Sequence, residues 1–314
     1  MKYKEWLDIW LENYVKPNAK MRTRESYERI IRKQIIEFLG ETELENLTAL
    51  DMQTFVTSLI TSGNKRTNGG LAASSVNTVI TVIQSSLKTA VKLGYVKKNV
   101  ADGIKRPKIK GKEVTSFTLK EQKKIERAAI EDSRSKMFGI VLCLYTGLRI
   151  GELLAVVWKD IDLKKGLIFV NKTCHDLKTA EGFKRITDEP KTESSKRVIP
   201  LPKQLLPHLK RLKRSGKGEH VVSIDGKPVA IRSYQRSFAF LLKKIKVPHK
   251  GFHSLRHTFA TRAIECGMDV KTLSEILGHK NAAITLNRYA HSLMEHKKEM
   301  MNRLGKMLAP YQKQ

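Results

Sequence analysis

Cysteine, long apolar runs and acidic side chains are all scarce in this sequence of 314 residues. Its three cysteines, Cys143, Cys174 and Cys266, show no CxxC spacing, which argues against a disulfide framework and against a zinc ribbon. No apolar run approaches the ~20 residues of a membrane span, and the N-terminus lacks the apolar core of a signal peptide. We therefore expect a soluble, cytoplasmic protein without membrane contact, in which Cys143 and Cys266 are small core residues.

The acidic residues are outnumbered by basic ones, with 31 Asp+Glu against 60 Lys+Arg and a formal net charge of +29. This charge exceeds what solubility requires and predicts a polyanionic partner, with nucleic acid as the leading candidate. No cluster of Asp and Glu stands ready to hold Mg²⁺, which disfavours a two-metal nuclease. Hydrophobic residues make up 40% of the chain, which is long enough for two domains with separate cores.

The first hundred residues carry four segments with the apolar periodicity of amphipathic helices. They cover residues 7–14, 31–39, 52–60 and 76–91, and the first two end near Pro17 and at Gly40. A flexible basic loop at 62–70, with Lys65 and Arg66, precedes the fourth segment. We expect an all-α domain over residues 1–105.

A basic linker is predicted over residues 106–116, because Pro107 blocks helix formation and glycines loosen the chain. We expect Arg106, Lys108 and Lys110 to lie along a phosphate backbone, as we do Lys65 and Arg66. The capping-box pattern of Thr118 and Glu121 then starts a second domain over residues 117–314.

The second domain opens with helices and continues into strand-like segments. An apolar helix at 137–147 stops at Gly147, and strand-like segments follow at 167–170, 183–186 and 196–201. Further helical segments lie at 203–214 and 231–246. We expect a mainly α protein with a small antiparallel β-sheet, in which a turn at 190–194 carries Lys191 at its tip.

Two groups of polar residues in this domain suggest an anion site. Glu152 follows Arg149 by three residues on a helix, so it can hold the guanidinium while leaving donors free, although such a pair alone is more often a surface feature. His253, Arg256 and His257 stand at i, i+3 and i+4, which gathers three donors on one side of a helix.

A zinc site of the HExxH kind is the alternative for these histidines. Ser254 stands where the catalytic glutamate would be, and Arg256 would place a fixed positive charge beside a dication, so we expect no metal. A purely structural His-Arg cluster is the other alternative. Beyond Gly278 and His279, Tyr289 lies among cationic residues, where a phenol is a candidate nucleophile.

Four motifs in this order resemble those of the tyrosine recombinase (integrase) family. They are Thr-Gly-Leu-Arg-Ile-Gly-Glu-Leu around Arg149, a hairpin lysine, His-Ser-Leu-Arg-His from His253, and Leu-Gly-His ending at His279, followed by Tyr289. The resemblance covers residues from about 118 to 291. It extends more loosely to the first domain, which resembles the family's helical core-type DNA-binding domain.

The resemblance implies a role for each matching residue and no cofactor. Tyr289 corresponds to the nucleophile and Lys191 to the acid that protonates the leaving 5′-oxygen, although Lys196 lies close enough to be the acid instead. Glu152 corresponds to the supporting carboxylate. The residues around the scissile phosphate would be Arg149, Arg256, His253 and His279.

The function implied by the resemblance is site-specific DNA recombination through a 3′-phosphotyrosine intermediate and a Holliday junction. We expect an integrase that integrates or excises a mobile element, acts as a homotetramer on double-stranded DNA sites, and has an accessory excisionase as a candidate partner. A type IB topoisomerase-like strand passer and a non-catalytic architectural DNA-binding protein are the alternatives. The family often has a further N-terminal arm-binding domain. This sequence starts at the core-binding helices, so either a simpler family branch or a shortened chain is expected.

The residues after Tyr289 predict a contact between subunits. Apolar side chains recur at i, i+1, i+4, i+7 and i+8 on a short terminal helix, at Met300, Met301, Leu304, Met307 and Leu308. This stripe packs either on its own domain or, as the resemblance favours, on a neighbouring subunit.

Overall fold

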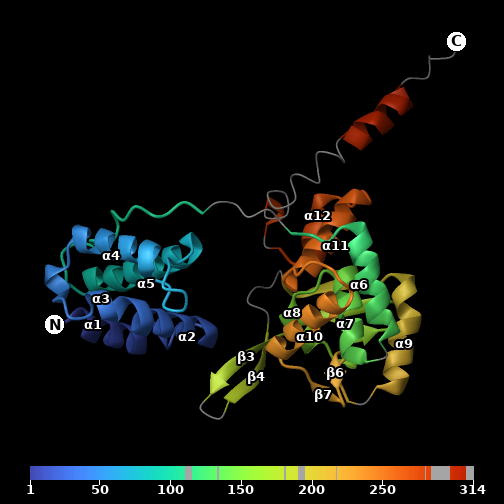
Figure 1. Cartoon of the computed structure of the whole chain (residues 1–314), viewed down its shortest axis with the longest axis horizontal. Helices are drawn as coiled ribbons and strands as arrows, with labels where there is room; N and C mark the ends of the chain where they lie inside the picture. Colours follow the sequence, from blue (N-terminus) through green and yellow to red (C-terminus); the bar gives the residue numbers. More distant parts are fainter. Residues whose placement is uncertain are drawn as a thin grey trace. The chain divides into compact units, whose positions relative to one another are not determined.

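The computed structural model describes residues 1–109, 115–132, 134–179, 182–189, 195–216, 218–279, 281–283 and 298–308. The chain forms two compact units, Met1–Lys112 and Glu113–Gln314 (Figure 1). The first unit is helical, and the second combines helices with short antiparallel sheets. The predicted fold class is therefore confirmed.

The four predicted helical segments of the first unit are all present. Two of them are extended by π-helical turns, at Leu11–Val15 and at Ile31–Ile35. Thr48 and Asp51 form a reciprocal capping box, which explains why the third segment begins where it does. The helices are α1 (Tyr3–Trp10), α2 (Met21–Ile30), α3 (Ile36–Leu39), α4 (Ala49–Ser62) and α5 (Ala73–Lys92).

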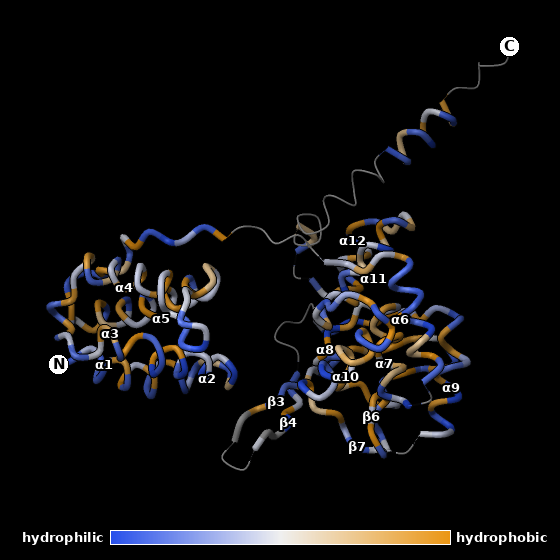
Figure 2. The backbone as a smooth tube through the Cα atoms, in the orientation of Figure 1, coloured by the Kyte–Doolittle hydropathy of each residue, from blue (hydrophilic) through white to orange (hydrophobic). Residues whose placement is uncertain are grey.

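The core of the first unit lies around α5, with two polar contacts inside it. The Tyr3 hydroxyl lies 2.9 Å from Ser86 Oγ, and Trp10 Nε1 donates to Thr89 Oγ1 at 3.1 Å, so α1 is tied to α5. Figure 2 shows that the helices of this unit carry both hydrophobic and hydrophilic residues. Phe38 and Ile60, both part of the predicted apolar stripes, are nevertheless 48% and 45% exposed.

The start of the predicted linker is bonded to α5. Arg106 Nη2 donates to Gln84 Oε1 at 2.6 Å, and the side chain of Asn77 donates to the Pro107 carbonyl at 3.1 Å. Arg106 and Pro107 thus lie against the first unit.

The second unit is built around α7, which is buried along nearly its whole length. Every residue from Met137 to Leu144 is buried, as expected for a helix that is apolar on all sides. The capping box predicted at Thr118 and Glu121 is present at the start of α6. The helices are α6 (Leu119–Glu131), α7 (Ser135–Thr146), α8 (Ile150–Ala155), α9 (Leu206–Ser215), α10 (Ile231–Lys244), α11 (His253–Glu265) and α12 (Val270–Leu277).

The strands of the second unit pair differently from what the sequence suggested. β2 (Leu167–Val170) lies between β1 (Ile161–Asp162) and β5 (Arg197–Pro200), all antiparallel, with Ile168 opposite Ile199. β4 (Gly182–Asp188) pairs with β3 (Thr173–Thr179), a strand that was not predicted. A small ribbon is formed by β6 (Ser223–Ile224) and β7 (Lys227–Pro228).

The expectation that the segments at 183–186 and 196–201 share one sheet is therefore wrong. β3 has the sequence Thr-Cys-His-Asp-Leu-Lys-Thr, which lacks the run of β-branched and aromatic residues that marks a strand. Its pairing comes from the hairpin with β4 and from contact with α8, both of which are tertiary effects.

Cys266 and most of residues 298–308 are exposed. Cys143 is buried as expected, but Cys266 is exposed because it caps the C-terminal end of α11 and does not lie on the helix's inner face. Residues 298–308 are helical, and Met301, Leu304, Met307 and Leu308 on this helix are exposed. Across the described ranges, no helix is both long and apolar enough to cross a membrane.

Candidate active site

The turn between α7 and α8 places Arg149 at the start of a helix. α7 ends at Gly147, which has a left-handed backbone (φ 64°) and donates its N–H to the Cys143 carbonyl at 2.9 Å. A Cβ here would lie 2.6 Å from the Phe259 ring and 2.8 Å from Leu277. Both the backbone angle and the close packing therefore require glycine at this position.

Arg149 and Glu152 form the interaction that their spacing predicted. Arg149 Nη1 donates to Glu152 Oε1 at 2.8 Å, and the Arg149 backbone N–H donates to Oε2 at 2.9 Å. The Glu152 side chain is only 4% exposed, whereas that of Arg149 is 37% exposed. The guanidinium is thus held on its inner side and accessible on its outer side.

Arg256 is buried, and it connects two turns of the site. It is 2% exposed, and its Nη1 donates to the Gly147 carbonyl at 2.8 Å. Its Nη2 donates to the Leu277 carbonyl at 2.7 Å and lies 2.9 Å from His279 Nε2. The turn before Arg149 and the turn that carries His279 are therefore tied to one guanidinium.

The second turn follows α12, which begins at the Asp269 cap and ends at Gly278. Gly278 has a left-handed backbone (φ 62°), and its carbonyl accepts from Arg149 Nη2 at 3.1 Å. The His279 N–H donates to the Ser274 carbonyl at 3.0 Å. Arg149, Glu152, Arg256 and His279 are brought together by these bonds although they come from three segments far apart in the sequence.

His253 and His257 lie at the start of α11, with ring centroids 4.5 Å apart and nearly perpendicular planes. His253 is exposed and Arg256 is buried, so the three donors of this motif lie at different depths. No group of three His, Cys, Asp or Glu residues suited to a metal occurs in the ranges that the structure describes.

Arg197, at the start of β5, belongs to this group and was missed in the sequence. Its Nη1 and Nη2 donate to Glu152 Oε1 and Oε2 at 3.1 and 3.0 Å, and its side chain is 6% exposed. Burial by itself raises the pKa of the Glu152 carboxyl, but the charge and hydrogen bonds of Arg197, followed by those of Arg149, hold that pKa below its usual value. Glu152 is thus a buried carboxylate between two guanidinium groups.

The sequence held only an indirect signal for Arg197. Glu152 lies in the apolar segment Ile-Gly-Glu-Leu-Leu-Ala, and a buried carboxylate requires a cationic partner. That reasoning predicts a partner without saying which of 60 basic residues it is.

The remaining predicted site residues fall into two groups. Lys196 is exposed and lies 3.2 Å from the Glu189 carboxylate. Lys191, Tyr289 and Lys110 lie outside the described residues. The choice between Lys191 and Lys196 as the acid therefore stays open.

The residues predicted to contact a phosphate backbone differ in their surroundings. Lys65 pairs with Glu37, and Arg106 is bonded to α5 as described above. Arg66 and Lys108 are exposed.

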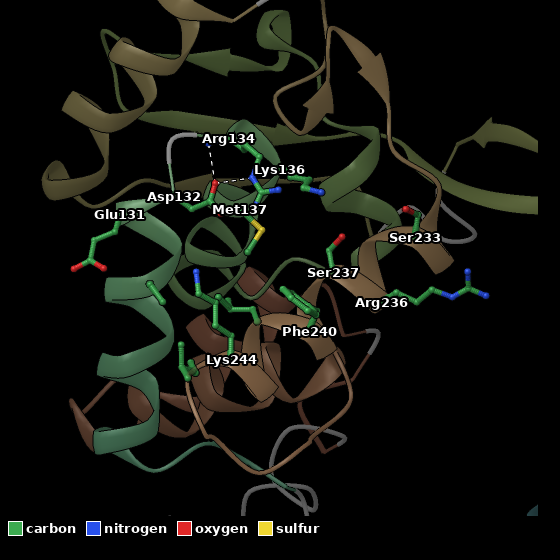
Figure 3. A pocket seen from close by; sticks show the side chains of 13 residues that line it. Glu131, Asp132, Arg134, Lys136, Met137, Ser233, Arg236, Ser237, Phe240 and Lys244 are labelled. Carbon is green, nitrogen blue, oxygen red and sulfur yellow. Dashed lines mark hydrogen bonds and ion pairs between the residues drawn. The ribbon is translucent and has the colours of Figure 1, made fainter.

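A separate cleft of about 760 Å³ lies between the start of α7 and α10 (Figure 3). Its lining includes Arg134, Arg236, Phe240 and Lys244, and Phe240 is 70% exposed. The cleft is at the N-terminal end of α7, whereas Gly147 ends that helix about 16 Å away at 1.5 Å per residue. It is thus distinct from the site around Arg149.

Two models of known protein families match this chain. The N-terminal SAM-like domain of phage integrases matches residues 2–60, and the phage integrase family model matches residues 115–296, more than half of the chain. The chain belongs to the phage integrase family. It is a tyrosine recombinase, an enzyme of DNA strand transfer that carries out site-specific recombination.

Two relatives illustrate the family. The chain is 29% identical to the tyrosine recombinase XerC-like protein of Caldanaerobacter subterraneus, over 95% of this chain and 81% of the relative. It is also 29% identical to the transposase from transposon Tn916 of Enterococcus faecalis, over 77% of this chain and 64% of the relative. The integrase thus spans somewhat less than two thirds of the transposon protein.

Solved structures share the fold of both units. The Tn1549 transposon integrase in complex with a circular intermediate DNA superposes with a TM-score of 0.80 at 25% identity, covering 97% of this chain and 99% of the other. A lambda integrase tetramer bound to a Holliday junction has a TM-score of 0.67 at 21% identity, covering 90% of this chain and 78% of the other.

Proposed function

We propose that this integrase cuts and rejoins double-stranded DNA at the recombination sites of a mobile element, with Tyr289 as the nucleophile. The observation that carries the proposal is the bonded group of Arg149, Glu152, Arg256 and His279. In this group the guanidinium groups of Arg149 and Arg256 and the His279 ring are held close to one another. The Arg149 guanidinium remains accessible on its outer side.

The chemistry of phosphodiester cleavage fits this arrangement. Attack by the Tyr289 oxygen forms an O–P bond and places additional charge on the non-bridging oxygens of the phosphate. Arginine donors that are already oriented stabilise this charge, and they do so most strongly where water is excluded. Arg149 and Arg256 take this role, with His253 and His279 as further donors.

Bond breaking requires an acid for the leaving 5′-oxygen. We assign this role to Lys191, with Lys196 as the alternative, because protonation by a positioned side chain contributes typically 10²–10⁴-fold to such a step. The phosphate remains bonded to Tyr289, so the bond energy is conserved and the reverse attack by a 5′-hydroxyl rejoins the strand without a nucleotide cofactor.

The partners follow from the charge and the relatives. The net charge of +29 supports binding to double-stranded DNA by both units, with Lys65, Arg66, Arg106, Lys108 and Lys110 as backbone contacts of residues 1–105 and of the linker at 106–116. The Tn1549 integrase in complex with a circular intermediate DNA supports a mobile-element substrate. The lambda integrase tetramer on a Holliday junction supports a homotetramer that exchanges strands in pairs.

We further propose that the terminal helix links the subunits. Its exposed Met301, Leu304, Met307 and Leu308 form an apolar face of the kind that packs into a neighbouring subunit, and methionine side chains adapt to more than one pocket. An accessory excisionase that sets the direction of recombination is a candidate further partner.

The function is tested by covalent trapping on nicked duplexes made from the ends of a candidate element. Wild-type protein should form a complex with DNA that resists denaturation, whereas Tyr289→Phe should bind the same DNA and form none, because only the attacking oxygen is lost. A covalent adduct from Tyr289→Phe would refute the assignment of the nucleophile. Absence of adduct from the wild type on its own element's ends would refute the proposed activity.

A further inference from the structure

We propose that Arg197 is a positioning residue for strand cleavage, in addition to the residues assigned above. Its buried guanidinium holds together two parts of the candidate active site, the start of α8 with Arg149 and Glu152 and the end of α12 that leads to His279. The inference rests on the proposed function, since it concerns the same site.

The hydrogen bonds of Arg197 reach two other segments of the chain, α8 and α12, and one carbonyl of its own segment. Nη1 and Nη2 donate to the two carboxylate oxygens of Glu152 on α8 at 3.1 and 3.0 Å. Nε donates to the Ile276 carbonyl in α12 at 2.5 Å, and Nη1 also donates to the Ser195 carbonyl at 3.2 Å. A planar guanidinium with five N–H groups in a fixed fork is the side chain that can satisfy such a set of acceptors at once.

The bonds to Glu152 and to the Ile276 carbonyl each support a different part of the site. Glu152 holds Arg149, so fixing the carboxylate fixes the phosphate-binding guanidinium. The Ile276 carbonyl lies two residues before Gly278, which accepts from Arg149, and three before His279.

The packing at Gly278 adds a steric reason for this placement. A Cβ built on Gly278 would lie 3.2 Å from both Cδ and Nη1 of Arg197, so the turn that carries His279 is seated on the Arg197 side chain. Movement of Arg197 would therefore displace Arg149, through its bond to Glu152, and His279, through this turn.

The electrostatic role of Arg197 gives a distinct pH signature. Glu152 is charged in the site because Arg197 and then Arg149 outweigh the effect of burial. Without Arg197, burial dominates and the pKa of Glu152 rises. The carboxylate then becomes protonated as the pH falls, and a protonated Glu152 holds Arg149 less firmly. A variant without Arg197 should consequently lose cleavage activity, relative to wild type, as the pH is lowered.

The experiment compares single-turnover formation of the covalent adduct by wild type, Arg197→Lys and Arg262→Lys on a nicked duplex. Rates are counted per protein molecule bound to DNA, so only folded chains contribute. Arg197→Lys keeps the charge but loses the fork, and we expect adduct formation to slow by roughly 10²-fold, the scale of a 1 Å misplacement, with little change in DNA affinity.

Arg262→Lys is the matched control, because Arg262 on α11 also uses its guanidinium to bridge segments. It donates to the Phe117 carbonyl at 3.0 Å and to Gln122 Oε1 at 3.2 Å, away from the site residues. We expect the parental cleavage rate from this variant. A parental rate from Arg197→Lys would overturn the inference.

A second pair of variants separates positioning from folding. Arg197→Met leaves the buried Glu152 carboxylate with one cation fewer. The double variant Arg197→Met, Glu152→Gln removes both charges, so no buried ion is left unpaired, and this favours folding. Both variants should cleave slowly, and only the single variant should lose further activity, relative to wild type, as the pH is lowered. A double variant that cleaves at the parental rate, or an acidic loss that persists in it, would refute the role assigned to Arg197 through Glu152.

The outcomes also distinguish this inference from the proposed function. If the wild type forms no adduct, the proposed function fails. If the wild type forms adduct and Arg197→Lys forms it equally fast, the function stands and only the role of Arg197 is rejected.

Discussion

Replacing Gly147 by alanine tests whether the turn before Arg149 is closed by tight packing. An L-residue in a left-handed conformation costs about 1–2 kcal/mol, and this applies to Gly147 because its φ is 64°. The added methyl group would also lie 2.6 Å from the Phe259 ring and 2.8 Å from Leu277, and overpacking of this kind costs about 1–3 kcal/mol. We expect Gly147→Ala to lower the free energy of unfolding by about 2–5 kcal/mol.

Gly166→Ala is the matched control in the same unit. Gly166 has nearly the same backbone angle, φ 66°, but a Cβ there would meet its nearest atoms at 3.6 Å, an ordinary contact distance. This variant should lose only the backbone term, about 1–2 kcal/mol. The difference of about 1–3 kcal/mol corresponds to roughly 2–12 °C in Tm for a unit of this size.

Scanning calorimetry of the intact chain measures both variants, and DNA cleavage below both transitions measures the effect on the site. The Gly147 carbonyl accepts from Arg256, and Arg149 follows two residues later, so Gly147→Ala should cleave more slowly than Gly166→Ala. Equal Tm values for the two variants would show that the Phe259 and Leu277 contacts impose no cost. Our account of the turn would then be wrong.

Three further predictions concern the acid, the DNA contacts and the assembly. A 5′-bridging sulfur, a better leaving group than oxygen, should restore cleavage to Lys191→Ala; rescue of Lys196→Ala instead would transfer the role of acid to Lys196. DNA affinity should fall steeply with salt, and Lys108→Ala should reduce the slope of log affinity against log salt concentration by about 0.9 while weakening binding to target and unrelated DNA alike. A salt-independent affinity would contradict a phosphate-contact role. Deleting the residues after Glu299 should leave half-site binding intact but impair synapsis and strand exchange, and recombination at the parental rate would argue against an exchanged tail.

Local sequence determined the parts of this integrase that depend on neighbours within about four residues. Apolar periodicity predicted the four helical segments of the first unit, and the Thr118–Glu121 spacing predicted the start of α6. Arg149 and Glu152 are three residues apart on one helix, so their ion pair is a local interaction and was predictable. The order and spacing of the motifs were likewise enough to predict the family.

Tertiary structure alone decided the features that join distant segments. β4 pairs with β3, and β5 pairs with β2, because strand pairing depends on which edges meet and not on strand propensity alone. Arg256 is buried and bonded to Gly147 and Leu277, whereas its spacing with His253 predicted only that both lie on one side of a helix. Cys266 is exposed because its helix ends there.

Arg197 shows most clearly why the sequence was insufficient. Glu152 and Arg197 are 45 residues apart and belong to a helix and a strand that meet only in the folded unit. A buried carboxylate needs cationic partners, but which cation reaches it depends on the path of the chain between them. The sequence therefore predicted which residues act on DNA, and the fold decided which side chains contact them.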